Sequence, residues 1–155
     1  MKVGIVVYSQ TGNTLSVATK LGEKLRAAGH TVTIEPIKLV GERKKGDRQF
    51  QLAPLPNPTP YDLLVVGSPV EAFSLSPVTS KALEQIVSLE KKGVLCLVTG
   101  GFPFPWLGAN RAVRRMRALC EAKGAVVRGG AVVNWVAKSL DRRITNAVDT
   151  LAALV

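Results

Sequence analysis

Short continuous apolar runs alternate along the chain with longer stretches in which apolar residues recur every three or four positions. A continuous run bounded by turn residues predicts a strand buried on both faces, and the longer period predicts a helix packed against a sheet. The predicted strands are residues 2–8, 62–67, 93–99 and 125–133, together with residues 31–37, where apolar and polar positions alternate as in an outer strand. The predicted helices are residues 14–28, 77–92 and 109–123, with a last one capped by Ser139.

One stretch breaks this alternation. Residues 38–60 are first basic and then rich in proline, and a loop of that length is uncommon in a compact domain. A helix that crosses the sheet belongs here, so we predict a short helix or turn near Gln49–Leu52. The other strands and helices alternate, which predicts a parallel, doubly wound α/β sheet with right-handed crossovers.

The turn after the first strand carries the strongest chemical signal in the chain. It follows the apolar run of residues 3–7, precedes a helical pattern, and reads Ser9-Gln10-Thr11-Gly12-Asn13-Thr14. Backbone N–H groups and the positive end of the helix dipole favour an anion at such a turn, and its hydroxyl groups add donors. Because the turn has no Lys or Arg, it suits a permanently held phosphate monoester better than a phosphoryl group that is transferred.

This turn resembles the FMN-phosphate loop of flavodoxins, whose pattern is Ser/Thr-x-Thr-Gly-x-Thr. The resemblance covers nearly the whole chain, and residues 9–14 are its one sharp motif. It implies a flavodoxin-like fold, in which a doubly wound, five-stranded parallel sheet of order 2-1-3-4-5 carries helices on both faces. A single domain would then span residues 1–155, with FMN bound between the loops that follow the first and third strands.

In flavodoxins two further loops enclose the isoalloxazine ring, and two segments of this chain are similar to them in position. Residues 67–77 follow the third predicted strand and residues 99–108 follow the fourth, and together they hold four of the chain's eight aromatic residues. A flat apolar ring system needs such faces, with backbone groups along its polar edge. The expected FMN contacts are Ser9, Gln10, Thr11, Gly12, Asn13, Thr14 and Leu15 in the first loop, Ser68, Pro69, Val70 and Phe73 in the second, and Thr99, Gly100, Gly101, Phe102, Phe104 and Trp106 in the third.

Within these loops, Phe73 is the predicted stacking residue on one side of the ring, with Phe102 or Trp106 opposite. Glu71 departs from the usual pattern. A carboxylate beside the ring would oppose an anionic reduced flavin, so we expect Glu71 to point to solvent. Ser68 has two interpretations, because its hydroxyl would either reach the cofactor or stabilise its own turn.

The net charge of the chain indicates which kind of partner to expect. The 21 basic and 11 acidic residues give a net charge of +10, whereas flavodoxins are typically acidic. An excess of this size favours anionic partners. We therefore expect a redox protein with an acidic docking surface and no specific nucleic acid. Arg111, Arg114 and Arg115 share one helix face after the third loop and form a candidate docking patch for this partner. The alternative interpretation is ordinary solvated surface charge.

Several classes of protein are excluded by missing residues. The first loop lacks the Lys-Ser/Thr of a P-loop and the Cys of a phosphatase of this fold, and the chain has no GxGxxG. No apolar run reaches the roughly 20 residues of a membrane span, and the start leaves no room for a signal peptide, so we expect a cytoplasmic protein. Cys96 and Cys120 lie in apolar patterns and are expected to be reduced core thiols.

The sequence thus predicts an FMN-binding redox protein that carries electrons between larger oxidoreductases. No catalytic residue and no metal ligand is assigned. The alternative is an enzyme, an FMN-dependent reductase that uses NAD(P)H or a quinone. A third possibility is a flavin-free interaction module on the same fold.

Overall fold

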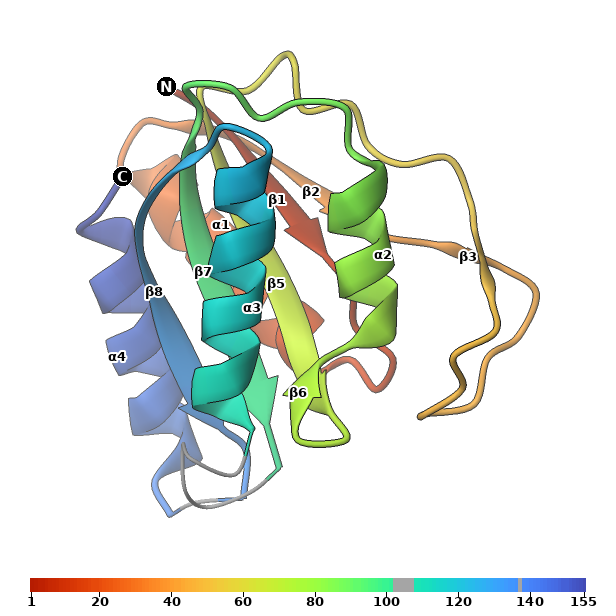
Figure 1. Cartoon of the computed structure of the whole chain (residues 1–155). Coiled ribbons are helices and arrows are strands. Elements are labelled where there is room, and N and C mark those ends of the chain that lie inside the picture. The colour runs from red at the N-terminus through yellow and green to blue at the C-terminus, as the bar shows by residue number, and fades with distance from the viewer. Residues whose placement is uncertain (102–107, 137) are drawn as a thin grey trace.

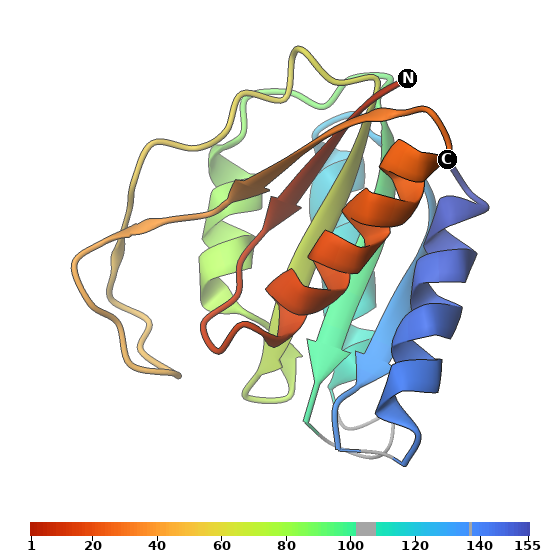
Figure 2. The same cartoon turned by 180° about the vertical axis from the view of Figure 1, so that it is seen from behind.

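A mostly parallel sheet lies between two layers of helices (Figures 1 and 2). The structure is a computed structural model, which describes residues 1–101, 108–136 and 138–155. The main strands are β1 (Lys2–Val7), β2 (Thr31–Pro36), β5 (Leu63–Glu71), β7 (Gly93–Gly100) and β8 (Val126–Asn134), and the short strands are β3 (Leu39–Val40), β4 (Gln51–Leu52) and β6 (Ser74–Leu75). The helices are α1 (Asn13–Ala27), α2 (Pro77–Gln85), α3 (Ala109–Ala122) and α4 (Leu140–Ala152). In the described part of the chain, no helix combines the length and apolar character that crossing a membrane requires.

The strand order confirms the predicted topology. The five main strands lie in the order β2-β1-β5-β7-β8, and every neighbouring pair among them is parallel. β6 turns back on the end of β5 as a short antiparallel hairpin. Since β1 has β2 on one side and β5 on the other, the chain reverses its direction of progress between β1 and β5, where α/β sheets bind ligands.

Both faces of the central strands β1, β5 and β7 are buried, which explains why these strands read as continuous apolar runs. Neighbouring residues of a strand point to opposite faces, so Leu63 packs with α1 and α4 while Leu64 packs with α2 and α3. Leu21 and Leu151 fill the first layer, and Met116 is fully buried in the second. The helices lie on both faces, as predicted (Figure 2).

The prediction for α2 was wrong at its end, because the helix stops at Gln85 and not near Lys92. Ile86 has extended backbone angles, and the chain continues without helix to Leu89, whose side chain is fully buried. The Leu89 N–H donates a 2.8 Å hydrogen bond to the Lys123 carbonyl at the end of α3. The apolar spacing therefore reflects burial of an extended segment and not a longer helix.

The predicted short helix or turn near Gln49–Leu52 was also wrong. β3 and β4 form an antiparallel ribbon there, with Leu39 opposite Leu52. Phe50 and Leu52 lie two residues apart and both pack against the core, a spacing that an extended chain satisfies and a helix does not. The four prolines between residues 54 and 60 keep the following chain extended.

The two cysteines are free thiols in the core, as predicted. Burial raises the pKa of both Cys96 and Cys120 to about 12. Both thiols are therefore neutral at physiological pH, and neither is an activated nucleophile.

Candidate functional site

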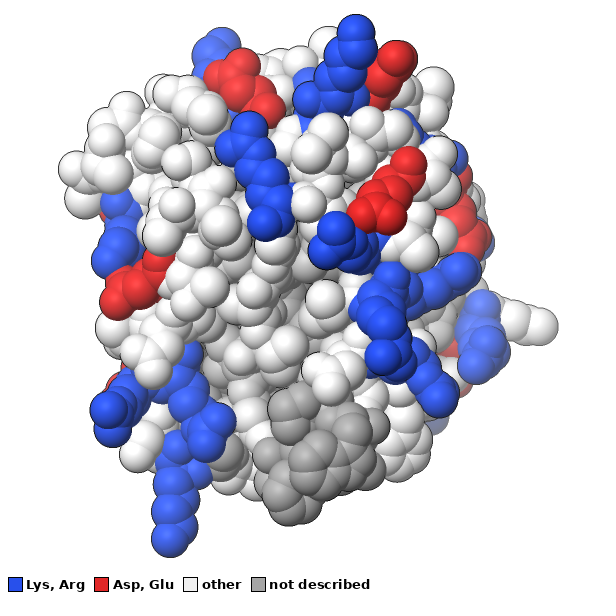
Figure 3. Space-filling model, turned by 60° about the vertical axis from the view of Figure 1, so that its left-hand side comes forward, with Lys and Arg blue, Asp and Glu red and all other residues white. Residues whose placement is uncertain are grey.

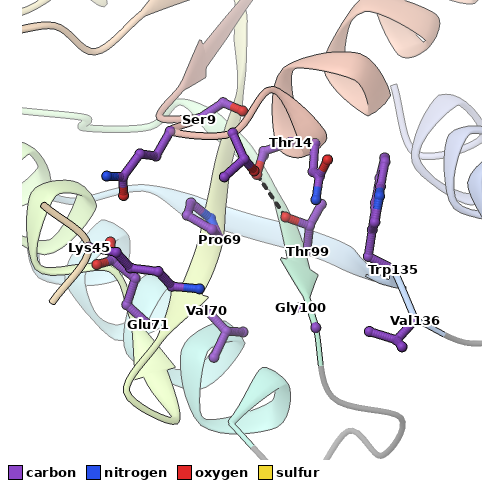
Figure 4. Close-up of a pocket in the computed structure, with 14 residues that line it drawn as sticks. Ser9, Thr14, Lys45, Pro69, Val70, Glu71, Thr99, Gly100, Trp135 and Val136 are labelled. Carbon is purple, nitrogen blue, oxygen red and sulfur yellow. Dashed lines mark hydrogen bonds between the residues drawn. The ribbon is translucent and has the colours of Figure 1, made fainter.

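A cavity of about 260 Å³ opens where β1, β5 and β7 end, at the reversal point of the sheet (Figure 4). Residues from all three expected loops meet there, joined by two segments that the sequence did not indicate. The lining residues are Ser9, Gln10, Thr11, Asn13, Thr14, Lys45, Pro69, Val70, Glu71, Thr99, Gly100, Gly101, Trp135 and Val136.

One end of the cavity lies at the start of α1, the positive end of the helix dipole. α1 begins after Gly12, which has φ 92°, a left-handed conformation that glycine adopts without strain. Gly12 has no side chain to cap the first turn, and no acidic residue lies in that turn. The Ser9 Oγ accepts a hydrogen bond of 3.2 Å from the Leu15 N–H, so the loop folds over the positive end of the helix. The Thr11 side chain lines the same end and is exposed.

Thr14 differs from Thr11 because it is almost completely buried. Its Oγ1 lies 2.7 Å from Oγ1 of Thr99 at the end of β7, and this hydrogen bond joins the first loop to the third (Figure 4). The backbone of Gly67 passes beneath, where an added Cβ would lie 3.2 Å from Thr14 Cγ2. Thr14 thus lines the cavity with a hydroxyl that already has a partner.

The other end of the cavity is apolar and aromatic. Val70 from β5 and Gly100 from β7 face Trp135 and Val136, which follow β8 (Figure 4). The Trp135 N–H donates a 2.8 Å hydrogen bond to the Gly100 carbonyl, which fixes the start of this segment beside β7. Trp135 was missed at the sequence level, although an aromatic residue directly after the last strand was an available signal.

Some predicted site residues lie away from the cavity. Ser68 is fully buried within β5, where its Oγ accepts a hydrogen bond from Thr79 of α2 and donates one to the Pro69 carbonyl, so it joins the strand to the helix. Gly12 and Leu15 do not line the cavity, and the Leu15 N–H donates to Ser9 Oγ. Phe73 sits in the β5–β6 turn with φ 62° and a half-exposed side chain, outside the cavity lining. Phe102, Phe104 and Trp106 lie outside the described residues.

The expectation that Glu71 points to solvent was wrong, because this residue is 3% exposed. Its carboxylate accepts hydrogen bonds of 2.9 and 3.2 Å from the Arg43 guanidinium, whose side chain is equally buried. The Gly46 N–H and the Ser76 hydroxyl donate to the same carboxylate. Burial alone would raise the pKa of Glu71, but hydrogen bonds from Arg43, Ser76 and Gly46 outweigh it and hold the pKa below its ordinary value.

The Arg43–Glu71 pair holds residues 43–47, which we call the strap, against the mouth of the cavity. Arg43 also donates to the Tyr8 hydroxyl at 3.2 Å, and Gln10 donates to the Arg43 carbonyl at 3.1 Å. Lys45, in the middle of the strap, lines the cavity on the side away from Trp135 (Figure 4). The strap therefore brings the lysine Lys45 to a cavity whose first loop, residues 9–14, has no basic residue.

Fold and site together define a flavodoxin-like α/β protein with a ligand cavity at its sheet reversal point. No protein-family model matches the chain, and no curated protein sequence is significantly similar to it.

Superposition on solved structures shows that the chain has the flavodoxin fold. Oxidised flavodoxin 1 from Bacillus cereus superposes with a TM-score of 0.71 at 16% identity, over 99% of this chain and 96% of that one. The flavodoxin of Streptococcus pneumonia gives 0.67 at 22% identity, with both chains fully covered. A Lactobacillus acidophilus flavoprotein in complex with FMN gives 0.64 at 19% identity, over 84% of this chain and 92% of that one.

Proposed function

We propose that this protein binds FMN in the cavity and carries electrons between oxidoreductases. The observation that carries the proposal is the division of the cavity into an anion-binding end at α1 and an apolar, aromatic end at β7 and β8. FMN has the same division, with a phosphate at one end and a flat ring system at the other. When bound, it would supply the electron-accepting chemistry, while the protein binds, orients and shields it.

The residues present fit such a cofactor. Ser9, Thr11 and the first turn of α1 would hold the phosphate, since they offer hydroxyl and backbone donors at a positive helix end. Trp135 and Val70 would contact the faces of the ring. Gly100 would leave the backbone accessible along the polar edge, because it lines the cavity and has no side chain.

The size of the cavity favours a carrier over a reductase. Its volume of about 260 Å³ is below the ~300–1,000 Å³ of pockets that enclose a ligand of this size, so part of the cofactor would stay open to solvent. Electron transfer needs only an exposed edge. Hydride transfer from NAD(P)H needs room for a second ring over the first.

The deciding experiment is addition of FMN to the purified protein, followed by gel filtration with absorption detection. We expect flavin absorption to co-elute with the protein in a 1:1 ratio. Failure to bind FMN would leave the flavin-free interaction module. Rapid steady-state turnover of NAD(P)H and a quinone by the protein alone would instead establish the reductase.

Two further aspects of the proposal concern location and partner. Two free buried thiols and no disulfide in the described residues are in keeping with a reducing compartment, and we place the protein in the cytoplasm. The net charge of +10 supports a redox partner with an acidic surface.

Trp135→Ala is expected to weaken FMN binding by about fivefold or more, the ~1 kcal/mol of a lost aromatic contact. Trp135→Phe keeps a ring and should recover most of the affinity. Fluorescence titration with FMN measures both variants. Equal affinity for Trp135→Ala and the parent would show that the ring binds elsewhere.

Lys45→Met is expected to weaken FMN binding by about fivefold, since an exposed charge pair contributes ~1 kcal/mol or less. Lys45 also favours added negative charge in the cavity, so its removal should lower the reduction potential of bound FMN. Lys44→Met is the matched control, because Lys44 is exposed and does not line the cavity. If the two variants behave alike, the strap does not place a cation near the cofactor.

A further inference from the structure

The outer edge of β8 is one of the two open edges of the main sheet, and the outer edge of β2 is the other. β8 is the last strand in the order, and it pairs with β7 on its inner side only. Successive residues of a strand direct their backbone N–H and C=O groups to opposite edges of that strand. The Trp135 N–H donates to Gly100 of β7, so the backbone groups of Gly130, Val132 and Asn134 face away from β7. An edge of this kind presents donors and acceptors to which another extended chain can add.

The middle of β8 borders a groove that it shares with α3. A groove of about 360 Å³ is lined by Gly130, Ala131 and Val132 of β8 and by Asn110, Val113 and Arg114 of α3. Gly130 is exposed and has no side chain, so the backbone of β8 is accessible at that point. No residue of this groove lines the FMN cavity.

The two helices that flank β8, one on each face of the sheet, both begin with exposed arginines. Figure 3 shows this face of the molecule, in which a mostly uncharged strip separates two groups of basic residues. Arg114 of α3 lines the groove, and Arg111 is exposed near the start of the same helix. Arg142 and Arg143 are exposed in the first turn of α4, which packs on the opposite face of the sheet. Asp141 is the single acidic residue in that turn of α4. Arg115, in contrast, points to α2 and pairs with Glu84.

We propose that the β8 edge binds an extended acidic segment of a partner protein by strand addition. The main chain of the segment pairs with Gly130, Val132 and Asn134, and its carboxylates face the arginines of α3 and α4. A second copy of this chain is a poor occupant, because edge-to-edge pairing would bring the two basic faces together. A nucleic acid matches the charge but lacks the peptide groups that a strand edge pairs with. This inference does not rest on the proposed FMN function.

The test uses the full-length protein and a labelled eight-residue peptide of alternating Glu and Val, measured by fluorescence anisotropy. We expect saturable binding that weakens as salt rises. The same peptide with alternate amides N-methylated keeps its charge but cannot form the ladder, and it should bind at least tenfold more weakly. Equal binding of the two peptides, or no saturable binding, would overturn the proposal.

Variants of the protein locate the interaction. Val132→Pro removes an outward N–H, and Val132→Ala is its matched control because it keeps that N–H. We expect at least a tenfold loss for Val132→Pro and little change for Val132→Ala. Where Val132→Pro impairs folding, Arg114→Glu with Arg142→Glu gives the same expected loss, against Lys20→Glu on α1 as control. Equal affinity for the double reversal and for Lys20→Glu would overturn the proposal, as would a single-stranded DNA that binds as tightly as the peptide, or dimerisation of the protein through this edge.

Discussion

Glu71→Gln is expected to lower the free energy of unfolding by about 3–5 kcal/mol. The change leaves the Arg43 guanidinium, with a side chain 1% exposed, without its anionic partner. Urea denaturation followed by far-UV circular dichroism measures the loss. Glu84→Gln is the matched control, since Glu84 pairs with Arg115 at the surface and the loss there should stay below ~1 kcal/mol.

A double variant distinguishes an unpaired charge from a general disturbance of the fold. Arg43→Met with Glu71→Gln removes both charges, and it should be more stable than Glu71→Gln alone. If Glu71→Gln costs no more than Glu84→Gln, the buried pair does not hold the strap in solution.

The same pair predicts how stability responds to acid. The pKa of Glu71 is lower in the folded protein than its ordinary value of 4.5, because burial, which raises it, is outweighed by Arg43, Ser76 and Gly46. The stabilisation is therefore complete above about pH 4.5 and is lost as the pH falls through the lowered folded pKa. Parent protein should lose stability steeply in this acidic range, whereas Glu71→Gln should lack that component.

Thr11→Ala is expected to weaken FMN binding by about tenfold to a hundredfold while leaving riboflavin binding nearly unchanged. A hydroxyl donor to a charged acceptor contributes roughly 1.5–3 kcal/mol, and riboflavin has no phosphate to lose it. Parallel fluorescence titrations with FMN and riboflavin measure the contrast.

Thr150→Ala on α4 provides the control, because Thr150 is exposed and does not line the cavity. Equal losses of FMN and riboflavin affinity in Thr11→Ala would show that the first loop is not the phosphate site. Thr14→Ala is less informative, since removal of its hydroxyl also leaves Thr99 without its buried partner.

The sheet could be predicted from the sequence because its signal is local. A strand buried on both faces must be apolar at every position, and β5 and β7 show this in their Leu and Val runs. The turn at residues 9–14 could be placed for the same reason, since it lies between an apolar run and a helical pattern. Its role as a phosphate site stays a prediction.

The strap could not be predicted, because its cause is a contact between residues 28 positions apart. Nothing near Arg43 or Glu71 in the sequence indicates that the two side chains meet in the interior. Each would ordinarily lie at the surface. Lys45 reaches the cavity only as a consequence of that pairing, and Trp135 does so only because β8 lies beside β7.

The hydrogen bond between Thr14 and Thr99 affects the entropic cost of binding in the proposed site. It joins two loops 85 residues apart in sequence through buried hydroxyl groups, so their relative position is settled when the protein folds. Ordering such loops at the moment of association would otherwise consume part of the binding free energy. For the proposed cofactor, a site whose loops are already joined would avoid that entropic loss.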